Sequence, residues 1–590
     1  MERLRGNLPL LLIWLAVCAV LILVTRGQIM TGIGWDPDDQ LRMVQLRDWL
    51  GGQSWFDTTQ YRIGEPDSQP MHWPRWIELP LASVFLLLKP VLGTTNAETA
   101  AMVIVPLITL GIAMWLVTKI TEPLFDRTIA LLAAALTATA VPVVAQIRPM
   151  RVDHHGWQIV LALTALWTMF WPEKRKGGIA LGVALALWLS ISLEGLPLSV
   201  AFIVLLVWRW VFQTGEGVRL FWTLLSFLAA SYLFYFATQG GFAVALNYCD
   251  AISPAHLLAF AAGAVIILPS ILWLPANRAL RVASLAVAGV AALAVLQAFA
   301  PQCMGGAFNT MDPIVREYWL VNVLEGLPIW YQNGKAMVTL LGGSIVVGLI
   351  SMLYILRTRP EGIERGRLFV LAYAFLWALL LSLFVQRATA VAAAFALPFM
   401  AWAVHQVFAR ARALKRPLSR IFATAAVVFL ILPGPLAVAL FNAVSDDEDS
   451  VEKSPESLAC RSDESLARLN SLPRSNILAP LDFGPRILLL TPHSVLATSH
   501  HRNDQAMADQ IRIFTSAPGV ARDLLEAHNI RFVVVCDAEP ELALYAKKQP
   551  DGLWAQLVKG RKPEWLQPVH IRDNGLRIWR IVPKGLRNET

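Results

Sequence analysis

Long apolar runs recur along this chain of 590 residues, and they constrain its fold more than any other feature. A transmembrane helix needs about 20 consecutive, mostly apolar residues, because its backbone polar groups must be satisfied within the segment. Thirteen runs approach that length, near residues 8–26, 98–119, 128–146, 157–172, 178–193, 196–213, 219–238, 257–274, 282–300, 336–356, 367–384, 388–406 and 420–441. The sequence predicts a polytopic α-helical membrane protein with about 13 transmembrane helices.

Composition excludes an ordinary soluble enzyme, since 56% of the residues are hydrophobic and only 16% are charged. The net charge of +8 does not indicate a nucleic-acid partner, because the basic residues gather in short connections between apolar runs. These basic connections begin just after residues 172, 274, 356 and 409. The positive-inside rule places the connections, together with the N-terminus, in the cytoplasm. The polar loops near Asp36 and Asp153 and the tail after Phe441 are then expected outside.

Two apolar segments need separate treatment. The first run follows a basic start and has no small-residue cleavage pattern close behind it, so we expect a retained anchor, with a cleaved signal peptide as the alternative. The run Leu79–Leu92 is short and contains Pro80 and Pro90. We expect it to form an interfacial or re-entrant helix.

The tail changes character at the acidic linker Ser445–Asp449, which divides a membrane domain (1–441) from an outer domain (442–590). Apolar runs at Ile487–Leu490 and Phe532–Val535 predict buried strands, and an amphipathic pattern near Ala521–Ala527 predicts a helix. The tail is therefore expected to be an extracytoplasmic α/β domain.

Four of the five cysteines fall in regions expected outside the membrane. An oxidising compartment permits the pairs Cys249–Cys303 and Cys460–Cys536, although sequence alone does not determine the pairing and buried free thiols are the alternative. Cys18 lies within the first apolar run.

Two polar clusters are expected at the outer membrane surface. The first holds Asp36, Asp38 and Asp39, and the second is Asp153-His154-His155. Carboxylates and imidazoles so close together can bind one cation, whereas a solvated or interfacial loop is the alternative for each cluster.

Two further charges belong to the same surface. Glu325 precedes the tenth run, and Arg387 lies between two later runs with no other charge close by. Singly, Glu325 could cap a loop helix and Arg387 could reach the headgroups. Together with the acids and the histidine they indicate a site where a divalent cation, Mg²⁺ or Mn²⁺, and an arginine stabilise a departing phosphate. Since no nucleotide sugar is available outside, the expected donor is a sugar on a polyprenyl phosphate or diphosphate.

These motifs resemble those of the GT-C membrane glycosyltransferases, in particular the catalytic subunit of oligosaccharyltransferase and its single-subunit relatives. Gly34-Trp35-Asp36-Pro37-Asp38-Asp39-Gln40-Leu41-Arg42 is similar to the family's first-loop motif, Asp153-His154-His155 to its second acidic motif, Val323-Leu324-Glu325 to its outer-loop motif, and Gln386-Arg387 to its phosphate-contacting arginine. The resemblance implies Asp36, Asp153, His155 and Glu325 as metal ligands and Arg387 as the phosphate-binding residue. It also implies inversion by direct displacement. Asp38 or Asp39 is our own candidate to orient or deprotonate the acceptor.

The acceptor motif departs from the family pattern. The family places a Trp-Trp-Asp-Tyr-Gly block at the head of its soluble domain, and the best match here, Pro480-Leu481-Asp482-Phe483-Gly484, lacks both tryptophans. Asp482 remains a substrate-binding candidate. His501, Arg502 and Asn503 in the polar run 498–503 could line the acceptor side, or the run could be a solvated loop.

The sequence thus predicts an enzyme that transfers a sugar or oligosaccharide from a lipid carrier to a glycan, glycolipid or protein acceptor. It is expected in a bacterial inner membrane, with its N-terminus cytoplasmic and its C-terminal domain periplasmic. The alternatives are a strict protein N-oligosaccharyltransferase, a single-sugar transferase acting on a glycolipid or lipopolysaccharide, and a lipid or glycan transporter. The last would require charges inside several spans and an internal repeat.

Overall fold

The computed structural model describes residues 2–213, 215–241, 247–431, 460, 462–571 and 575–584. The chain divides into two compact units, each assembled from separate stretches of sequence. The first, called here the membrane unit, contains Met1–Met30, Leu79–Asn309 and Leu324–Asp446. The second, called here the outer unit, contains Thr31–Glu78, Thr310–Val323 and Asp447–Thr590. The expected linker Ser445–Asp449 lies outside the described residues.

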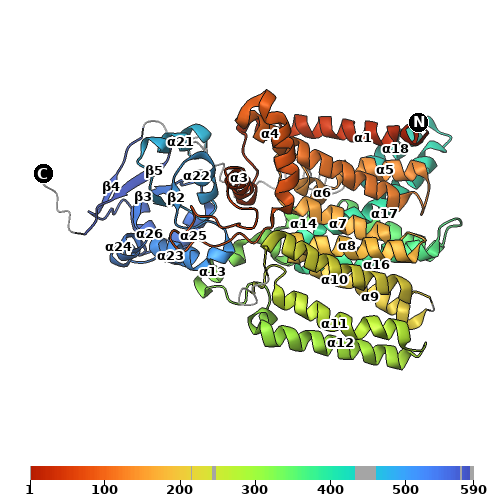
Figure 1. Ribbon diagram of the computed structural model, residues 1–590. Helices are drawn as coiled ribbons and strands as arrows, with labels where there is room; N and C mark the ends of the chain where they lie inside the picture. Colours follow the sequence, from red (N-terminus) through yellow and green to blue (C-terminus); the bar gives the residue numbers. More distant parts are fainter. Residues whose placement is uncertain are drawn as a thin grey trace. The chain divides into compact units, whose positions relative to one another are not determined.

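The membrane unit is a bundle of helices that run alongside one another (Figure 1). Its α-helices are α1 (Glu2–Val24), α2 (Arg26–Thr31), α4 (Glu78–Thr121), α5 (Arg127–Leu136), α6 (Val141–Gln146), α7 (His155–Thr168), α8 (Lys174–Ile191), α9 (Leu196–Phe212), α10 (Gly217–Gln239), α11 (Pro254–Trp273), α12 (Arg278–Phe299), α14 (Gly334–Leu341), α15 (Ser344–Thr358), α16 (Arg365–Phe384), α17 (Thr389–Arg412) and α18 (Pro417–Ile431). Short 3₁₀ turns connect several of them: η2 (Thr137–Thr139), η3 (Leu193–Gly195), η4 (Pro301–Gly305), η6 (Leu324–Gly326), η7 (Ile329–Tyr331) and η8 (Gln386–Ala388).

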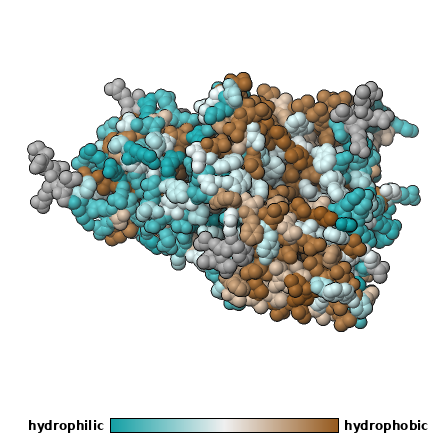
Figure 2. All heavy atoms as spheres, viewed as in Figure 1, coloured by the Kyte–Doolittle hydropathy of each residue, from teal (hydrophilic) through white to brown (hydrophobic). Residues whose placement is uncertain are grey.

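Among the described residues, eight helices are long and apolar enough to cross a membrane, or nine if the bent pair α14–α15 counts as one span. Hydrophobic residues cover much of the face of this bundle that Figure 2 shows, as expected where lipid is the solvent. The protein is therefore a multi-pass α-helical membrane protein. The runs expected near 128–146, 157–172 and 178–193 are also helical, but α5 to α7 are shorter and α8 begins with three basic residues. The run near 420–441 continues past the described residues, and the count of 13 stays a prediction.

The segment expected as an interfacial helix forms the first part of α4. The chain turns at Gly93, whose φ of 74° lies in the left-handed region that glycine adopts without a steric penalty. Residues before Gly93 are helical and carry exposed apolar side chains, including Leu86, Leu87 and Val91. The second part of α4 contains the run expected near 98–119.

Close packing of α8 against α10 depends on small residues. A Cβ at Gly182 of α8 would lie 2.2 Å from Ser226 Oγ and 2.3 Å from the Thr223 carbonyl oxygen of α10. Small residues allow the backbones of membrane helices to approach in this way, because lipid supplies little hydrophobic driving force for helix association.

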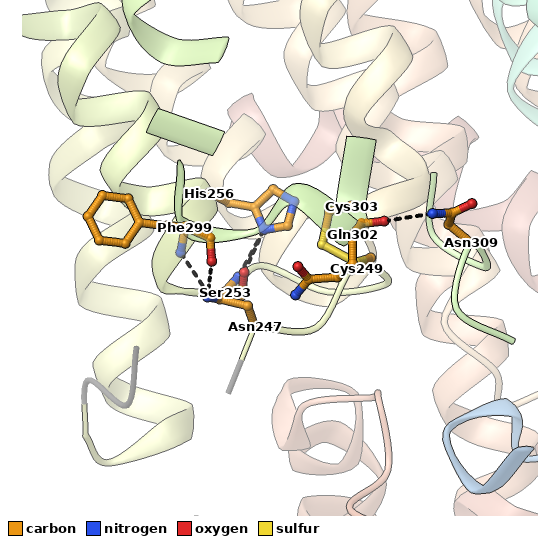
Figure 3. Close-up of a disulfide and its surroundings, with 9 residues drawn as sticks. Asn247, Cys249, Ser253, His256, Phe299, Gln302, Cys303 and Asn309 are labelled. Atoms are coloured by element: carbon orange, nitrogen blue, oxygen red, sulfur yellow. Dashed lines mark hydrogen bonds between the residues drawn. A yellow bond between two sulfur atoms is a disulfide. The ribbon is translucent and has the colours of Figure 1, made fainter. Parts of the chain in front are cut away.

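Both expected disulfides are confirmed, as Cys249–Cys303 in the membrane unit and Cys460–Cys536 in the outer unit. Figure 3 shows that the first ties the loop before α11 to η4 after α12. Asn247 reinforces the link, since its Nδ2 donates to the Phe299 carbonyl and its Oδ1 accepts from the Ala255 N–H. The two ends of the α11–α12 hairpin are thus joined covalently. Cys18 is a buried free thiol.

The outer unit is built on a five-stranded sheet with the order β2-β1-β3-β5-β4. Its strands are β1 (Asn476–Leu478), β2 (Ser494–Val495), β3 (Ile530–Val535), β4 (Leu566–Pro568) and β5 (Arg577–Ile581). Strands β2, β1 and β3 are parallel, and β5 is antiparallel to both β3 and β4. Its helices are α3 (Pro37–Leu50), α13 (Pro313–Tyr318), α21 (Asp463–Ala467), α22 (Gly484–Leu490), α23 (Asp504–Thr515), α24 (Pro518–Ala527), α25 (Pro540–Lys548) and α26 (Leu553–Val558), with 3₁₀ turns η1 (Arg75–Ile77), η5 (Leu320–Asn322), η9 (Arg468–Ser471) and η10 (His501–Asn503).

Of the elements expected in the tail, the strand near Phe532–Val535 and the helix near Ala521–Ala527 are confirmed as β3 and α24. The strand expected at Ile487–Leu490 is wrong, because these residues form most of α22. Four consecutive apolar residues do not distinguish a buried strand from a buried helix, and Pro485 in the first helical turn favours the helix.

The segment Thr31–Glu78 belongs to the outer unit because it is bonded to α22. Helix α3 packs on α22, and two arginines cap the carbonyl end of that helix. Arg62 donates to the carbonyls of Leu488 (2.7 Å) and Thr491 (2.9 Å), and Arg47 donates to the carbonyl of Leu489. Positive charge at a helix C-terminus is favourable because the last carbonyls have no partner within the helix.

A buried ion-pair cluster forms between residues of this same segment. Arg42 Nη1 and Arg75 Nη1 lie 3.4 Å and 2.8 Å from the two Glu78 carboxylate oxygens, and all three side chains are at most 1% exposed. Arg42 also stacks over Trp73, 4.4 Å from its ring centroid. The arginine that ends the first-loop motif is therefore part of the core of this unit.

We predict that Glu78→Gln destabilises the protein by about 3–5 kcal/mol, because Arg42 and Arg75 then lose their shared buried counter-charge. Thermal unfolding of the detergent-purified protein measures the effect. Glu122→Gln is the matched control, since Glu122 pairs with Arg127 at 3.0 Å in a partly exposed position and should change stability by less than about 1 kcal/mol. Equal melting temperatures for the two variants would contradict the prediction.

Candidate active site

The loop between α6 and α7 presents the Asp-His-His motif from a constrained backbone. Met150 has a φ of 71°, uncommon for a residue with a side chain, and its N–H donates to the Met102 carbonyl at 2.9 Å. Asp153, His154 and His155 follow this turn, and these residues are only 4–5% exposed. The loop therefore holds three titratable groups inside the protein.

Asp153 contacts both histidines. Its Oδ1 accepts from the His154 backbone N–H at 2.6 Å and contacts His154 Nδ1, while Oδ2 lies 3.1 Å from His155 Nε2. Arg151 Nη2 is 3.5 Å from the same Oδ2. Each member of the motif offers a ligand atom within 4.8 Å of the others, a spacing that suits one bound metal ion.

Arg387 lies between two glutamates. It belongs to η8, between α16 and α17, and its Nη1 is hydrogen-bonded to Glu194 Oε1 while its Nη2 lies 3.0 Å from Glu325 Oε1. The Gln386 N–H donates to the Leu327 carbonyl at 3.0 Å, which joins η8 to the turn that carries Glu325. Burial raises the pKa of Glu325, but the opposing charges, chiefly Arg387, lower it further, so its pKa lies below the usual range.

Glu194 and Gln158 connect the arginine to the histidines. Glu194 Oε2 accepts from Gln158 Nε2 at 3.0 Å and lies 3.8 Å from His155 Nδ1 and 3.9 Å from His154 Nε2. Trp188 Nε1 donates to Gln158 Oε1 at 3.2 Å, which orients the amide so that its NH₂ group faces Glu194 and His155. The structure thus brings Asp153, His155, Glu325 and Arg387 into one network on the membrane unit.

Glu194 was not among the residues expected from sequence, although a signal for it was present. The pentapeptide Leu-Glu-Gly-Leu-Pro occurs at residues 193–197 and again at residues 324–328, where it carries the expected Glu325. A search for short internal repeats would have flagged Glu194.

The other expected residues belong to the outer unit. Asp36 is the N-cap of α3, and its Oδ1 accepts from the Asp39 N–H at 3.0 Å. Asp39 Oδ2 in turn accepts from the N–H groups of Trp35 (3.0 Å) and Asp36 (3.3 Å), which completes a capping box, and Asp39 is fully buried. Asp38 lies in the first turn of the same helix. The two aspartates after Pro37 therefore differ in environment.

The acceptor-side candidates are also in the outer unit. Asp482 is exposed in the turn before α22. His501, Arg502 and Asn503 form η10: the His501 ring lies 4.3 Å from that of His72, Arg502 Nη1 donates to the Met71 carbonyl at 3.3 Å, and Asn503 is buried. The polar run 498–503 is thus packed against the segment Thr31–Glu78 and is largely not a solvated loop.

Comparison by sequence gives no assignment. No protein-family model matches the chain, and no curated protein matches it.

Comparison by structure shows the fold: a helical membrane bundle followed by an α/β domain. The chain is similar to the oligosaccharyltransferase AglB of Archaeoglobus fulgidus in complex with an inhibitory peptide and a dolichol-phosphate, with a TM-score of 0.63 and 15% identity over 94% of this chain and 72% of that one. Structures of the same archaeal enzyme tethered to a peptide with an NVT sequon (TM-score 0.59, 15% identity, 88% and 68% covered) and in complex with Zn and sulfate (TM-score 0.55, 15% identity, 89% and 67% covered) are also similar.

We predict that Gln158→Leu lowers the free energy of unfolding by about 1–3 kcal/mol, because the buried Trp188 N–H and the Glu194 carboxylate each lose a hydrogen-bond partner. Gln158→Glu should be worse, since it places a second carboxylate against Glu194. Thermal unfolding in detergent checks both variants. The control is Gln239→Leu at the exposed end of α10. A Gln158→Leu variant as stable as this control would show that the hydrogen bonds of Gln158 to Trp188 and Glu194 do not stabilise the protein.

Proposed function

We propose that this protein is a metal-dependent glycosyltransferase that moves a sugar or oligosaccharide from a polyprenyl phosphate or diphosphate to an acceptor at the outer face of a membrane. One observation supports this most: within a fold shared with an oligosaccharyltransferase, Arg387 is linked through Glu194 to a buried Asp-His-His cluster. A guanidinium beside a potential metal site is suited to a phosphate leaving group.

The donor atoms fit a divalent cation. Asp153 and His155 would supply a carboxylate oxygen and an imidazole nitrogen from within 4.8 Å of each other, with Glu325 as a further ligand. The role of Asp36 as a metal-binding acid rests on the resemblance of its loop. Oxygen-rich sites favour Mg²⁺ or Mn²⁺, and the imidazole shifts the preference toward Mn²⁺. A bound cation would stabilise negative charge on the departing phosphate.

Residues of this chain would act on both the leaving phosphate and the acceptor in a displacement reaction. The acceptor atom forms a bond to the anomeric carbon while the bond from that carbon to the phosphate oxygen breaks, and the configuration inverts. Arg387 stabilises the negative charge that leaves on the phosphate. Asp38 is the better candidate to take the acceptor's proton, because Asp39 is fully buried and its Oδ2 already accepts two backbone N–H groups in the capping box.

The acceptor is the open part of the proposal. The archaeal enzyme has been captured with an NVT peptide, which favours a protein acceptor as the second candidate. The block Pro480-Leu481-Asp482-Phe483-Gly484 lacks the tryptophans of the oligosaccharyltransferase motif, which favours a glycan or glycolipid acceptor. We propose a bacterial inner membrane as the location, with the C-terminal domain periplasmic.

Deleting the gene tests the function in the cell. Mass spectrometry should show that a sugar is lost from periplasmic glycoproteins, from lipopolysaccharide or from capsule, and the affected class identifies the acceptor. Wild-type protein and Asp67→Ala, an exposed acid of the same segment, should restore the sugar, whereas Asp36→Ala should not. Unchanged profiles in the deletion strain, or restoration by Asp36→Ala, would refute the proposal.

Direct binding tests the metal. Titration of the purified protein with Mn²⁺, followed by calorimetry, should show one site, and Asp153→Asn should weaken it by about tenfold or more, since one charged ligand is lost. Asp67→Asn is the matched control. Equal Mn²⁺ affinity for wild type and Asp153→Asn would show that Asp153 is not a metal ligand.

A further inference from the structure

The repeated pentapeptide Leu-Glu-Gly-Leu-Pro forms the same structure twice. Each copy folds its Leu-Glu-Gly part into a 3₁₀ turn, η3 at residues 193–195 and η6 at residues 324–326. The glutamate of each turn bonds one terminal nitrogen of the same guanidinium, that of Arg387. We propose that Glu194 is a positioning residue, which with Glu325 fixes the Arg387 guanidinium for the phosphate of the donor; this rests on the proposed function.

The turn that carries Glu194 is held rigidly. A Cβ at Gly195 would lie 2.5 Å from Trp188 Nε1, so only glycine allows η3 to pack against this fully buried indole. Pro197 stands in the first turn of α9, immediately after η3. The Ser192 side chain also accepts from the Glu194 N–H, which caps the turn. Glu194 is therefore presented by a turn with little freedom between α8 and α9.

The Glu194 carboxylate uses both of its oxygens. Oε1 bonds Arg387, while Oε2 bonds Gln158 and lies within 4 Å of a nitrogen of each histidine. Glu325 bonds the second terminal nitrogen of Arg387 at 3.0 Å. Two carboxylates on the two terminal nitrogens leave the guanidinium little freedom to rotate.

The negative charge of Glu194 allows a positioning role for this residue to be distinguished from direct phosphate binding. Arg387 attracts a phosphate, whereas a carboxylate next to it repels one. Removing the charge of Glu194 should therefore preserve or strengthen lipid-phosphate binding while it loosens the arginine and slows transfer. A purely structural residue would lower stability without separating these two quantities.

The test uses the full-length protein in detergent, with undecaprenyl phosphate as the binding probe and sugar transfer as the second measurement. We expect Glu194→Gln to lower turnover by about 10- to 100-fold without weakening binding of the probe. Arg387→Gln should lose both. The double variant should lose no more turnover than Arg387→Gln alone, because Glu194 acts through the arginine.

The matched control is Glu122→Gln, another glutamate of the membrane unit that pairs with an arginine, and it should leave both quantities unchanged. Glu194→Asp is a second variant, which keeps the negative charge on a side chain that is shorter by one methylene. It should lower turnover and leave the KM for the donor unchanged. If Glu194→Gln does not fold, the aspartate variant decides the question.

Wild-type turnover in Glu194→Gln or Glu194→Asp, or additive losses in the double variant, would overturn the inference. Loss of probe binding in Glu194→Gln to the extent seen in Arg387→Gln would also overturn it. These results leave the proposed function intact as long as Arg387→Gln is impaired. A wild-type protein that neither binds undecaprenyl phosphate nor transfers a sugar would instead refute the proposed function.

Discussion

The guanidinium of Arg387 is the charge on which the polar interior of the membrane unit depends. Ionised groups at membrane depth persist when they are paired, and this arginine pairs two glutamates that come from turns far apart in the sequence. Through Glu194 and Gln158 the same network reaches His155 and Asp153. Each member therefore has a counter-charge or a hydrogen bond before any ligand arrives, and this pre-organisation lets such a site stabilise charge during a reaction.

The same physical rule organises the outer unit. Glu78 is buried between Arg42 and Arg75, and the carbonyl end of α22 is capped by Arg47 and Arg62. The bonds from Arg47 and Arg62 join the first loop of the chain to the C-terminal domain, while the Glu78 cluster lies within that loop. As a result, Asp36 belongs to one compact unit with Asp482 and His501, the residues proposed for the acceptor side, although more than four hundred residues separate it from them in the sequence.

The comparison with the archaeal oligosaccharyltransferase and the local chemistry are complementary. The fold extends over most of the chain at 15% identity, so the shared architecture reflects packing more than individual residues. The charged cluster, by contrast, consists of named side chains with short contacts. This chain carries a block at residues 480–484 that lacks tryptophan, and two Leu-Glu-Gly-Leu-Pro turns whose glutamates both contact Arg387.

The sequence by itself determined the membrane character, the position of most helices and the α/β character of the tail, and it permitted the two disulfide pairs that the structure contains. These follow from apolar run length, local periodicity and compartment, which are properties of short stretches. Through short motifs it also predicted one site of Asp36, Asp153, His155, Glu325 and Arg387, and the last four form one network in the membrane unit.

Only the tertiary structure decided which charges meet. It placed Glu194 beside Arg387 and made Asp39 part of a capping box with Asp36. It also made Ile487–Leu490 part of a helix, α22, that packs on α3. The Glu194–Arg387 pair and the packing of α22 on α3 depend on contacts between residues distant along the chain, whereas the capping box of Asp36 and Asp39 is local. Local pattern can mark a charged residue as a candidate but does not name its partner, because the free energy of pairing a buried charge is determined by the partner that the fold places beside it.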